Sequence, residues 1–154
     1  MEPRMNFYQK GNSAMKGLYT LSQYLHRSPV EQNLLDLVYF RVSQINGCAY
    51  CLDMHSKDLR AMGETEQRLY MLNAWRDTPV YTERERAALA YAEAVTKIPD
   101  GQVSTSVYEA ANTQFSDEEL VDLTMAIVAI NAYNRINIAF TIPGGSYVPG
   151  QHAM

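Results

Sequence analysis

Cysteine and histidine are scarce in this sequence. Its 154 residues include two cysteines, Cys48 and Cys51, and three histidines. A bond between two cysteines that lie three positions apart closes only a small loop and adds little to fold stability through chain entropy. A framework of structural disulfides is therefore excluded. The pair needs a chemical explanation instead, and a reducing compartment suits it.

The sequence also lacks long apolar runs and any long run of charges of one sign. The N-terminus has no apolar signal core, and the longest charge-poor helical run, LTMAIVAINAYN, is too short to cross a bilayer. The formal charge is -4, with 13 basic and 17 acidic residues scattered along the chain. No basic stripe is therefore available to hold a phosphate backbone. We expect a soluble, cytoplasmic protein that binds neither membranes nor nucleic acid.

Apolar residues are present in a helical pattern and in sufficient number for one domain. Because 47% of the residues are hydrophobic, we expect residues 1–154 to form a single domain around one core. Apolar positions recur with the period of a helix, and the sequences SPVE, TERE and SDEE each have the pattern of a capping box. The pattern predicts an all-α fold of about seven helices, at residues 7–26, 30–45, 48–62, 65–77, 82–97, 104–114 and 117–140.

Two of the predicted helices are apolar on nearly every face. They contain LLDLVYF at 34–40 and the stretch from Leu120 to Ile142. A helix that is apolar all round must be covered all round, so we expect other copies of the chain to supply part of the cover. The alternative is a central helix wrapped by the other six in a monomer. The uncharged tail at 142–154 is expected to be loose or to lie over a neighbouring subunit.

Both cysteines and one histidine are gathered in the stretch QINGCAYCLDMH at 44–55. On a helix, Cys48, Cys51 and His55 fall within an arc of about 60°, so their side chains point the same way. Gly47 ends the preceding helix and leaves Cys48 in the first turn of the next one, where the helix dipole favours a thiolate. His55, one turn after Cys51, can transfer a proton near neutral pH. This arrangement is typical of thiol redox chemistry.

Asp36 is the fourth residue that we assign to this site. It interrupts the apolar run at 34–40, and a buried carboxylate without a partner is costly. Across the turn at 46–47, an Asp36–His55 pair would orient the imidazole. Other interpretations stay open at this point. Asp36 can cap a helix or pair elsewhere, the four side chains can bind zinc, or the cysteines and the histidine can simply be buried in the core.

The stretch from Arg41 to Thr96 resembles the core of the AhpD-like alkylhydroperoxidases, within the carboxymuconolactone decarboxylase family. The most specific part is the motif Glu-x11-Cys-x2-Cys-x3-His, which reads here as Asp36, Cys48, Cys51 and His55. NAYNRINIAF at 131–140 is similar to the last core helix of the family. The resemblance implies an AhpD-like helical bundle that assembles as a trimer or hexamer. It also implies reduction of hydroperoxides through the cysteine pair, with no metal and no other cofactor.

Two residues depart from the family pattern. Asp36 replaces the glutamate of the motif and is one methylene shorter. Tyr50 stands where the alkylhydroperoxidase has a histidine directly before its second cysteine. Tyr50 can donate a hydrogen bond to a peroxide oxygen, which would make it a substrate-binding residue, or it can only pack.

The function that we expect is that of a thiol-dependent peroxidase. Proximity to His55 and the family's assignment favour Cys51 as the peroxidatic residue and Cys48 as the resolving one, although the helix dipole favours Cys48. A dithiol partner, either a lipoyl group or a thioredoxin-like protein, would then reduce the disulfide. Two alternatives remain: a lyase or decarboxylase that acts on a lactone acid without using the thiols, and a protein disulfide reductase.

Overall fold

A computed structural model describes residues 2–151, in which helices alternate with turns and no strand occurs. The α-helices are α1 (Phe7–Lys10), α2 (Asn12–Leu25), α3 (Gln32–Asn46), α4 (Ala49–Ala61), α5 (Glu66–Met71), α6 (Glu83–Lys97), α7 (Thr105–Gln114) and α8 (Asp117–Ala139). Two short 3-10 helices, η1 (Leu72–Asp77) and η2 (Pro99–Gly101), lie between them. The all-α prediction is confirmed. Within residues 2–151, no helix has the length and apolarity that a membrane span requires.

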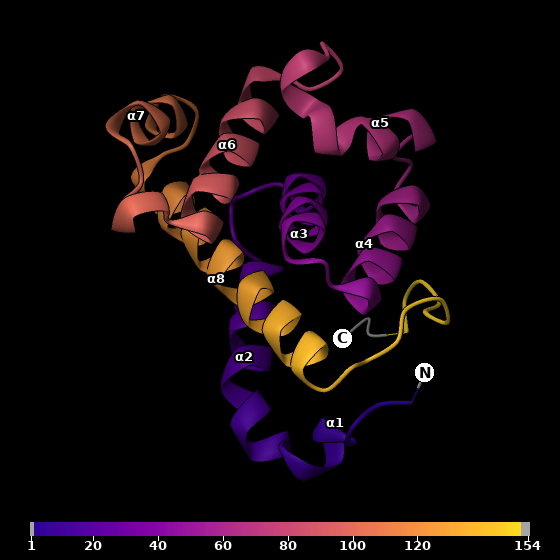
Figure 1. Ribbon diagram of the computed structural model, residues 1–154. Coiled ribbons are helices and arrows are strands. Elements are labelled where there is room, and N and C mark those ends of the chain that lie inside the picture. The colour runs from indigo at the N-terminus through magenta and orange to yellow at the C-terminus, as the bar shows by residue number, and fades with distance from the viewer. Residues whose placement is uncertain (1, 152–154) are drawn as a thin grey trace.

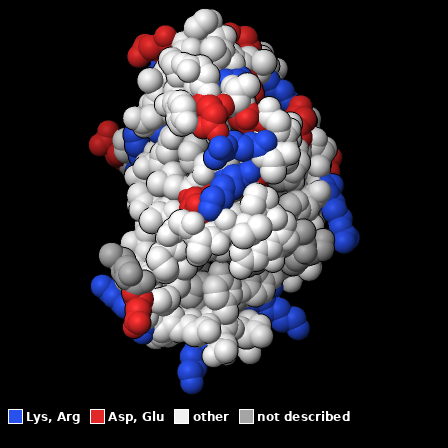
Figure 2. Space-filling model, turned by 90° about the vertical axis from the view of Figure 1, so that its right-hand side faces the viewer, with Lys and Arg blue, Asp and Glu red and all other residues white. Residues whose placement is uncertain are grey.

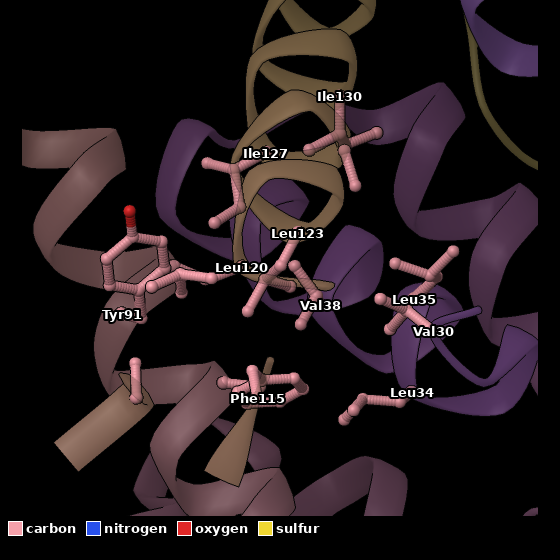
Figure 3. Packing of buried hydrophobic residues seen from close by; sticks show 14 of the residues in the cluster. Val30, Leu34, Leu35, Val38, Tyr91, Phe115, Leu120, Leu123, Ile127 and Ile130 are labelled. Carbon is pink, nitrogen blue, oxygen red and sulfur yellow. The ribbon is translucent and has the colours of Figure 1, made fainter. Parts of the chain in front are cut away.

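Helix α3 lies at the centre of the bundle. It packs against α4, α6 and α8, and Figure 1 shows it nearly end-on between these helices, with α7 outside α6. Its buried residues Leu35 and Val38 share one hydrophobic cluster with Leu123 and Ile127 of α8 (Figure 3). Because α3 is central, its apolar faces are covered by helices of the same chain. This is the cover that the monomer alternative requires for a central helix.

The predicted helix at 7–26 is interrupted at Gly11, so the described residues contain eight α-helices instead of about seven. Gly11 ends α1 and begins α2, with φ -114° and ψ 18°. Glycine loses more backbone freedom in a helix than any other residue, which makes it a favourable place for a break. The break lets Phe7 turn into the bundle, where its ring stacks on that of Phe140 at 5.5 Å between centroids.

The capping box predicted at 28–31 does not form. Helix α3 begins two residues later than expected, and its N-cap Glu31 makes no side-chain capping bond. The carboxylate of Glu31 instead accepts hydrogen bonds from Arg84 of α6 at 3.0 Å. The Glu31 side chain is thus engaged in an ion pair between helices and does not cap α3. The boxes that begin at Thr82 and Ser116 both form as predicted.

The predicted helix at 65–77 changes type after Met71. It continues as η1, in which Ala74 departs from helical dihedral angles. Leu72 and Trp75, on either side of this kink, are both buried with Leu59 of α4 in a second hydrophobic cluster.

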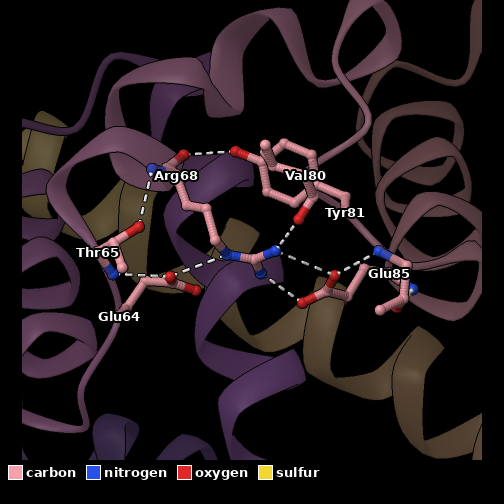
Figure 4. Close-up of polar contacts among 7 residues, drawn as sticks. Glu64, Thr65, Arg68, Val80, Tyr81 and Glu85 are labelled. Atoms are coloured by element: carbon pink, nitrogen blue, oxygen red, sulfur yellow. Dashed lines mark hydrogen bonds and ion pairs between the residues drawn. The ribbon is translucent and has the colours of Figure 1, made fainter.

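Arg68 connects α5 to the start of α6 (Figure 4). Its Nε donates to Glu64 at 2.9 Å, its Nη2 donates to Glu85 at 2.5 Å, and its Nη1 donates to the carbonyl oxygen of Val80. Such charge-assisted hydrogen bonds are stronger than neutral ones. They hold the connection between η1 and α6 in place.

The face that carries α4, α5 and the C-terminal segment is turned to the viewer in Figure 2. Basic and acidic side chains lie side by side in its upper half, and uncharged areas separate the charged side chains of its lower half. On this face, therefore, the charges do not add up to a field of one sign that would steer a strongly charged partner.

Candidate active site

The candidate site begins at the turn between α3 and α4. Gly47 ends α3 with φ +69°, in the left-handed conformation that glycine favours. Cys48 is the N-cap of α4, one position earlier than the predicted first turn, and its Sγ accepts a hydrogen bond from the Cys51 N–H at 3.3 Å. The sulfur of Cys48 therefore takes the capping role that a serine hydroxyl usually has.

Cys48 and Cys51 form a disulfide, with their Cα atoms 5.3 Å apart. Each residue is only 1% exposed. A Cα separation of this size is usual for disulfides. In residues 2–151, no group of three or more His, Cys, Asp or Glu side chains is placed to hold a metal ion. Two sulfurs joined in a disulfide are able to take part in thiol–disulfide exchange.

His55 and Asp36 are brought together across the α3–α4 turn. His55 Nδ1 lies 3.7 Å from Asp36 Oδ1, and both residues are buried. This is an ion-pair distance but exceeds a hydrogen bond, and neither imidazole nitrogen has a hydrogen-bond partner among the described residues. Gln32 fixes the carboxylate from the other side, because its Nε2 donates to Asp36 Oδ2 at 2.8 Å. The short side chain of aspartate thus points toward the imidazole but does not come within hydrogen-bond distance of it.

Asn137 of α8 contacts the site, although the sequence analysis did not assign it a role. Its Nδ2 donates to Cys51 Sγ at 3.3 Å. Two further asparagines of α8, Asn131 and Asn134, accept hydrogen bonds from Asn46 at the end of α3, each at 2.9 Å. The signal in the sequence was the three-residue spacing of these asparagines in NAYNRIN, which puts them on one side of a helix.

A pocket of about 290 Å³ opens beside Cys48. It is lined by residues 47–49, by Asn137 and Ile138 at the end of α8, and by residues 141–144. A larger surface hollow of about 480 Å³ lies between residues 76–79 and Arg86. No cysteine or histidine lines that hollow, so the smaller pocket is the better candidate for a substrate site.

The C-terminal segment at 142–151 folds back onto α4 of the same chain. Asp53 Oδ2 accepts hydrogen bonds from the N–H groups of Gly145 and Tyr147 at 2.7 Å and 3.0 Å, and Lys57 Nζ donates to the Tyr147 carbonyl at 2.8 Å. The expectation that this segment is loose is therefore wrong for residues 142–151, whereas a contact of the segment with a neighbouring subunit stays a prediction. Residues 152–154 lie outside the described part.

Tyr147 and Gly144 fix the path of this segment. The hydroxyl of Tyr147 donates to the Asp58 carboxylate at 3.0 Å, and burial followed by this bond raises the pKa of Tyr147 to about 12. A Cβ at Gly144 would lie 2.5 Å from the carbonyl oxygen of Ala49. Only glycine therefore permits this close approach of the segment to the first turn of α4.

Tyr50 packs among other tyrosines. Its ring lies edge-on to that of Tyr147 at 6.5 Å between centroids, and its hydroxyl is hydrogen-bonded to Tyr8. Burial, reinforced by the nearby hydroxyl of Tyr147, raises the pKa of Tyr50. These contacts agree with the packing alternative, and a substrate-binding role for Tyr50 stays a prediction.

The sequence and the fold place the chain in a known protein family. Residues 13–94 match the carboxymuconolactone decarboxylase family, and the helical bundle with its Cys-x-x-Cys pair is AhpD-like. The chain belongs to this family. It is 40% identical over 139 residues to the uncharacterized protein YdfG of Bacillus subtilis (strain 168), which corresponds to 90% of this chain and 95% of YdfG.

Several solved structures share the fold, and two of them are compared with this chain. One, from Agrobacterium tumefaciens, is a protein of unknown function described as a candidate AhpD antioxidant defence protein. It is 40% identical with a TM-score of 0.90, and the match covers 95% of this chain and 100% of that chain. The other is an alkylhydroperoxidase AhpD core, an uncharacterized peroxidase-related protein from Ralstonia eutropha JMP134. It is 17% identical with a TM-score of 0.78, and covers 94% of this chain and 77% of that chain. At that identity it shows the fold alone.

Proposed function

We propose that the protein is a thiol-dependent peroxidase that reduces hydroperoxides through Cys48 and Cys51. The observation that carries this proposal is the disulfide at the start of α4, with His55 one turn beyond Cys51 and Asp36 3.7 Å from the imidazole. Two sulfurs within bonding reach and a proton donor beside them are what a reversible two-electron thiol reaction needs. The antioxidant role suggested for the Agrobacterium relative supports the same function.

In the proposed first half-reaction, the Cys51 thiolate attacks the distal oxygen of the hydroperoxide. The S–O bond forms, the O–O bond breaks, and the leaving alkoxide takes a proton from His55. The Cys48 thiol then attacks the sulfenic sulfur and releases water, which gives the disulfide. We assign the first attack to Cys51 because Asn137 Nδ2 donates to its sulfur.

In the proposed second half-reaction, a dithiol reduces the disulfide. Cys48 lines the pocket at the end of α8, so the donor thiolate attacks Cys48 and Cys51 leaves as a thiolate. The second thiol of the donor then attacks its own sulfur in the mixed disulfide, which releases Cys48 as a thiolate and leaves the donor as a disulfide. A pocket of about 290 Å³ admits a dithiol on a flexible arm more easily than the surface of a folded protein. A lipoyl group is therefore the donor that we favour over a thioredoxin-like protein.

The proposed function is tested by mass spectrometry of the reduced protein after one equivalent of an organic hydroperoxide. We expect the protein to lose two hydrogens and to become resistant to alkylation at Cys48 and Cys51, while one equivalent of alcohol forms. Thiols that remain fully alkylatable would contradict the proposal and favour a lyase that does not use them. A parallel reaction with a protein disulfide as the oxidant measures the reductase alternative on the same thiols.

We also propose that the chain forms a homo-oligomer, a trimer or a hexamer, through α8. One side of this helix exposes Val121, Met125 and Val128, with Val121 62% and Val128 48% exposed. These residues are spaced by four and three positions and form an apolar stripe. Soluble monomers rarely leave such a stripe open, and closed symmetry is the usual way for identical chains to cover it.

Val128→Glu is expected to dissociate this assembly without unfolding the chain, because the side chain of Val128 lies on the surface of its own subunit. Light scattering should give a multiple of 17.4 kDa for the wild type and a mass near 17.4 kDa for the variant. Val148→Glu, at a valine outside α8 that is 63% exposed, is the control and should keep the assembly. Ile130 is unsuitable for this test, because it is buried in the core of its own chain. A wild-type mass near 17.4 kDa would contradict the proposed assembly.

A further inference from the structure

We infer that Asn137 is a catalytic residue of this site, whose amide nitrogen stabilises the Cys51 thiolate and whose amide oxygen holds the hydroxyl hydrogen of the hydroperoxide. The inference rests on the proposed function and adds a second acting group beside His55. Two atoms of the Asn137 side chain, Nδ2 and Oδ1, carry the argument. Nδ2 donates to Cys51 Sγ at 3.3 Å, and Oδ1 is buried with no hydrogen-bond partner among the described residues.

The contact between Asn137 and Cys51 favours the ionised sulfur. A disulfide sulfur has no hydrogen and can only accept, so the amide presents its N–H group to Cys51. A thiolate is a stronger acceptor at the same position, and a hydrogen bond to the charged form lowers the pKa of a group. Because Asn137 is only 5% exposed, water competes little for this bond.

The free oxygen of Asn137 argues against a role in packing alone. Buried carbonyl oxygens are nearly always hydrogen-bonded, and an unpaired one is destabilising. A leucine has the same number and branching of side-chain heavy atoms and would carry no unpaired oxygen. Oδ1 is about 2.2 Å from Nδ2 within the planar amide, and Asn137 lines the pocket beside Cys48. A buried acceptor of this kind, on a residue of the pocket wall whose nitrogen contacts the sulfur, suits a ligand that brings its own hydrogen.

A hydroperoxide brings such a hydrogen. Its terminal O–H group can donate to Asn137 Oδ1 while the Cys51 thiolate attacks the same oxygen. The S–O bond forms as the O–O bond breaks, two electrons pass from sulfur to the alkoxide, and the alkoxide takes a proton from His55. The hydrogen held by Oδ1 stays on its oxygen and becomes that of the sulfenic acid. The amide thus keeps one hydrogen bond through the whole step.

The first test uses the Cys48→Ser variant, in which Cys51 is the single thiol and serine replaces cysteine at the N-cap of α4. The pKa of Cys51 is measured from the ultraviolet absorbance of its thiolate, with no substrate present. Asn137→Leu is expected to raise this pKa by about one unit, which means about tenfold less thiolate at neutral pH. Asn137→Asp, which keeps the size and adds a negative charge, should raise it further. Asn131→Ala removes an asparagine that does not touch the sulfur and should leave the pKa unchanged.

An unchanged pKa in both Asn137 variants would overturn the thiolate role. The acceptor role is tested separately, at a pH where Cys51 is fully ionised in every variant. There Asn137→Leu should still react with an alkyl hydroperoxide about tenfold more slowly than its parent, and equal rates would overturn that role.

The role of Asn137 and the proposed peroxidase function fail in different ways. If the wild type does not reduce hydroperoxides, the absorbance titration still reports on Asn137, whereas an active wild type with unshifted variants rejects Asn137 alone.

Discussion

Replacing Cys51 with serine is expected to abolish hydroperoxide reduction and to leave no sulfenic acid that a dimedone probe can trap. The substitution removes the sulfur that Asn137 contacts and that lies one turn from His55. Cys48→Ser should behave differently, because the peroxidatic sulfur remains while the resolving thiol is absent. That variant is expected to consume one equivalent of hydroperoxide and to stop as a sulfenic acid at Cys51. Peptide mass spectrometry of the dimedone adduct locates the oxidised residue.

The two variants control for each other. Each exchanges one sulfur for one oxygen, and serine at position 48 can keep the capping bond to the N–H of residue 51. Circular dichroism should therefore show equal helix content in both. An adduct at Cys48 in the Cys51→Ser variant would reverse the assignment of roles. Catalytic turnover retained by either variant would show that a disulfide within the chain is not an obligatory intermediate.

Glu93→Ala is expected to cause the largest loss of stability among single substitutions outside the cysteine site. Glu93 of α6 is 7% exposed, and its carboxylate accepts hydrogen bonds from Arg41 of α3, Trp75 of η1 and Arg76 at distances of 2.9, 2.9 and 2.7 Å. Removing the carboxylate leaves the buried guanidinium of Arg41 without its main partner. Losing one partner of a buried pair typically costs about 3–5 kcal/mol in the free energy of unfolding. Urea unfolding at a fixed protein concentration measures the change.

Glu66→Ala is the matched control, because Glu66 pairs with Arg60 on the surface, where both side chains are about half exposed. An exposed pair contributes about 0–1 kcal/mol, so a similar loss in both variants would contradict the importance of the Glu93 cluster.

The pH dependence of the free energy of unfolding gives a second measure of the Glu93 cluster. Burial alone raises the pKa of Glu93, but hydrogen bonds from Trp75, Arg76 and Arg41 lower it below 4.5, its ordinary value. The cluster therefore stabilises the fold fully above pH 4.5. The advantage of the wild type over Glu93→Gln should shrink as the pH falls through the lowered pKa.

The helices and the centre of the site could be predicted because the interactions that form them are local. The capping boxes at Thr82 and Ser116 each join residues three positions apart, and both form. Gly47 ends α3 as expected, because the left-handed conformation favours glycine whatever surrounds it. Helical spacing was enough to predict that Cys51 and His55 lie on one side of α4, whereas Cys48 lies beside them at the N-cap.

The features that were missed depend on residues far apart in the chain. Arg84 lies 53 residues from Glu31 and binds the carboxylate of this N-cap residue. Asn137 lies 86 residues from Cys51, and the distance between them is set only when α8 packs against α3 and α4. The anchor of the C-terminal segment on Asp53 likewise joins residues 92 and 94 positions apart.

The sequence by itself determined the all-α class, the turn at Gly47 and the gathering of two sulfurs and an imidazole, since helical period, caps and glycine act over a few residues. The Asp36–His55 pair was also predicted from the sequence, but only the tertiary structure decided its separation of 3.7 Å. It also decided that an asparagine from the last helix would donate to Cys51, and that residues 141–144 would form a wall of the pocket beside Cys48. These contacts depend on how whole helices pack, and the packing minimises exposed apolar surface over the entire chain rather than at any one motif.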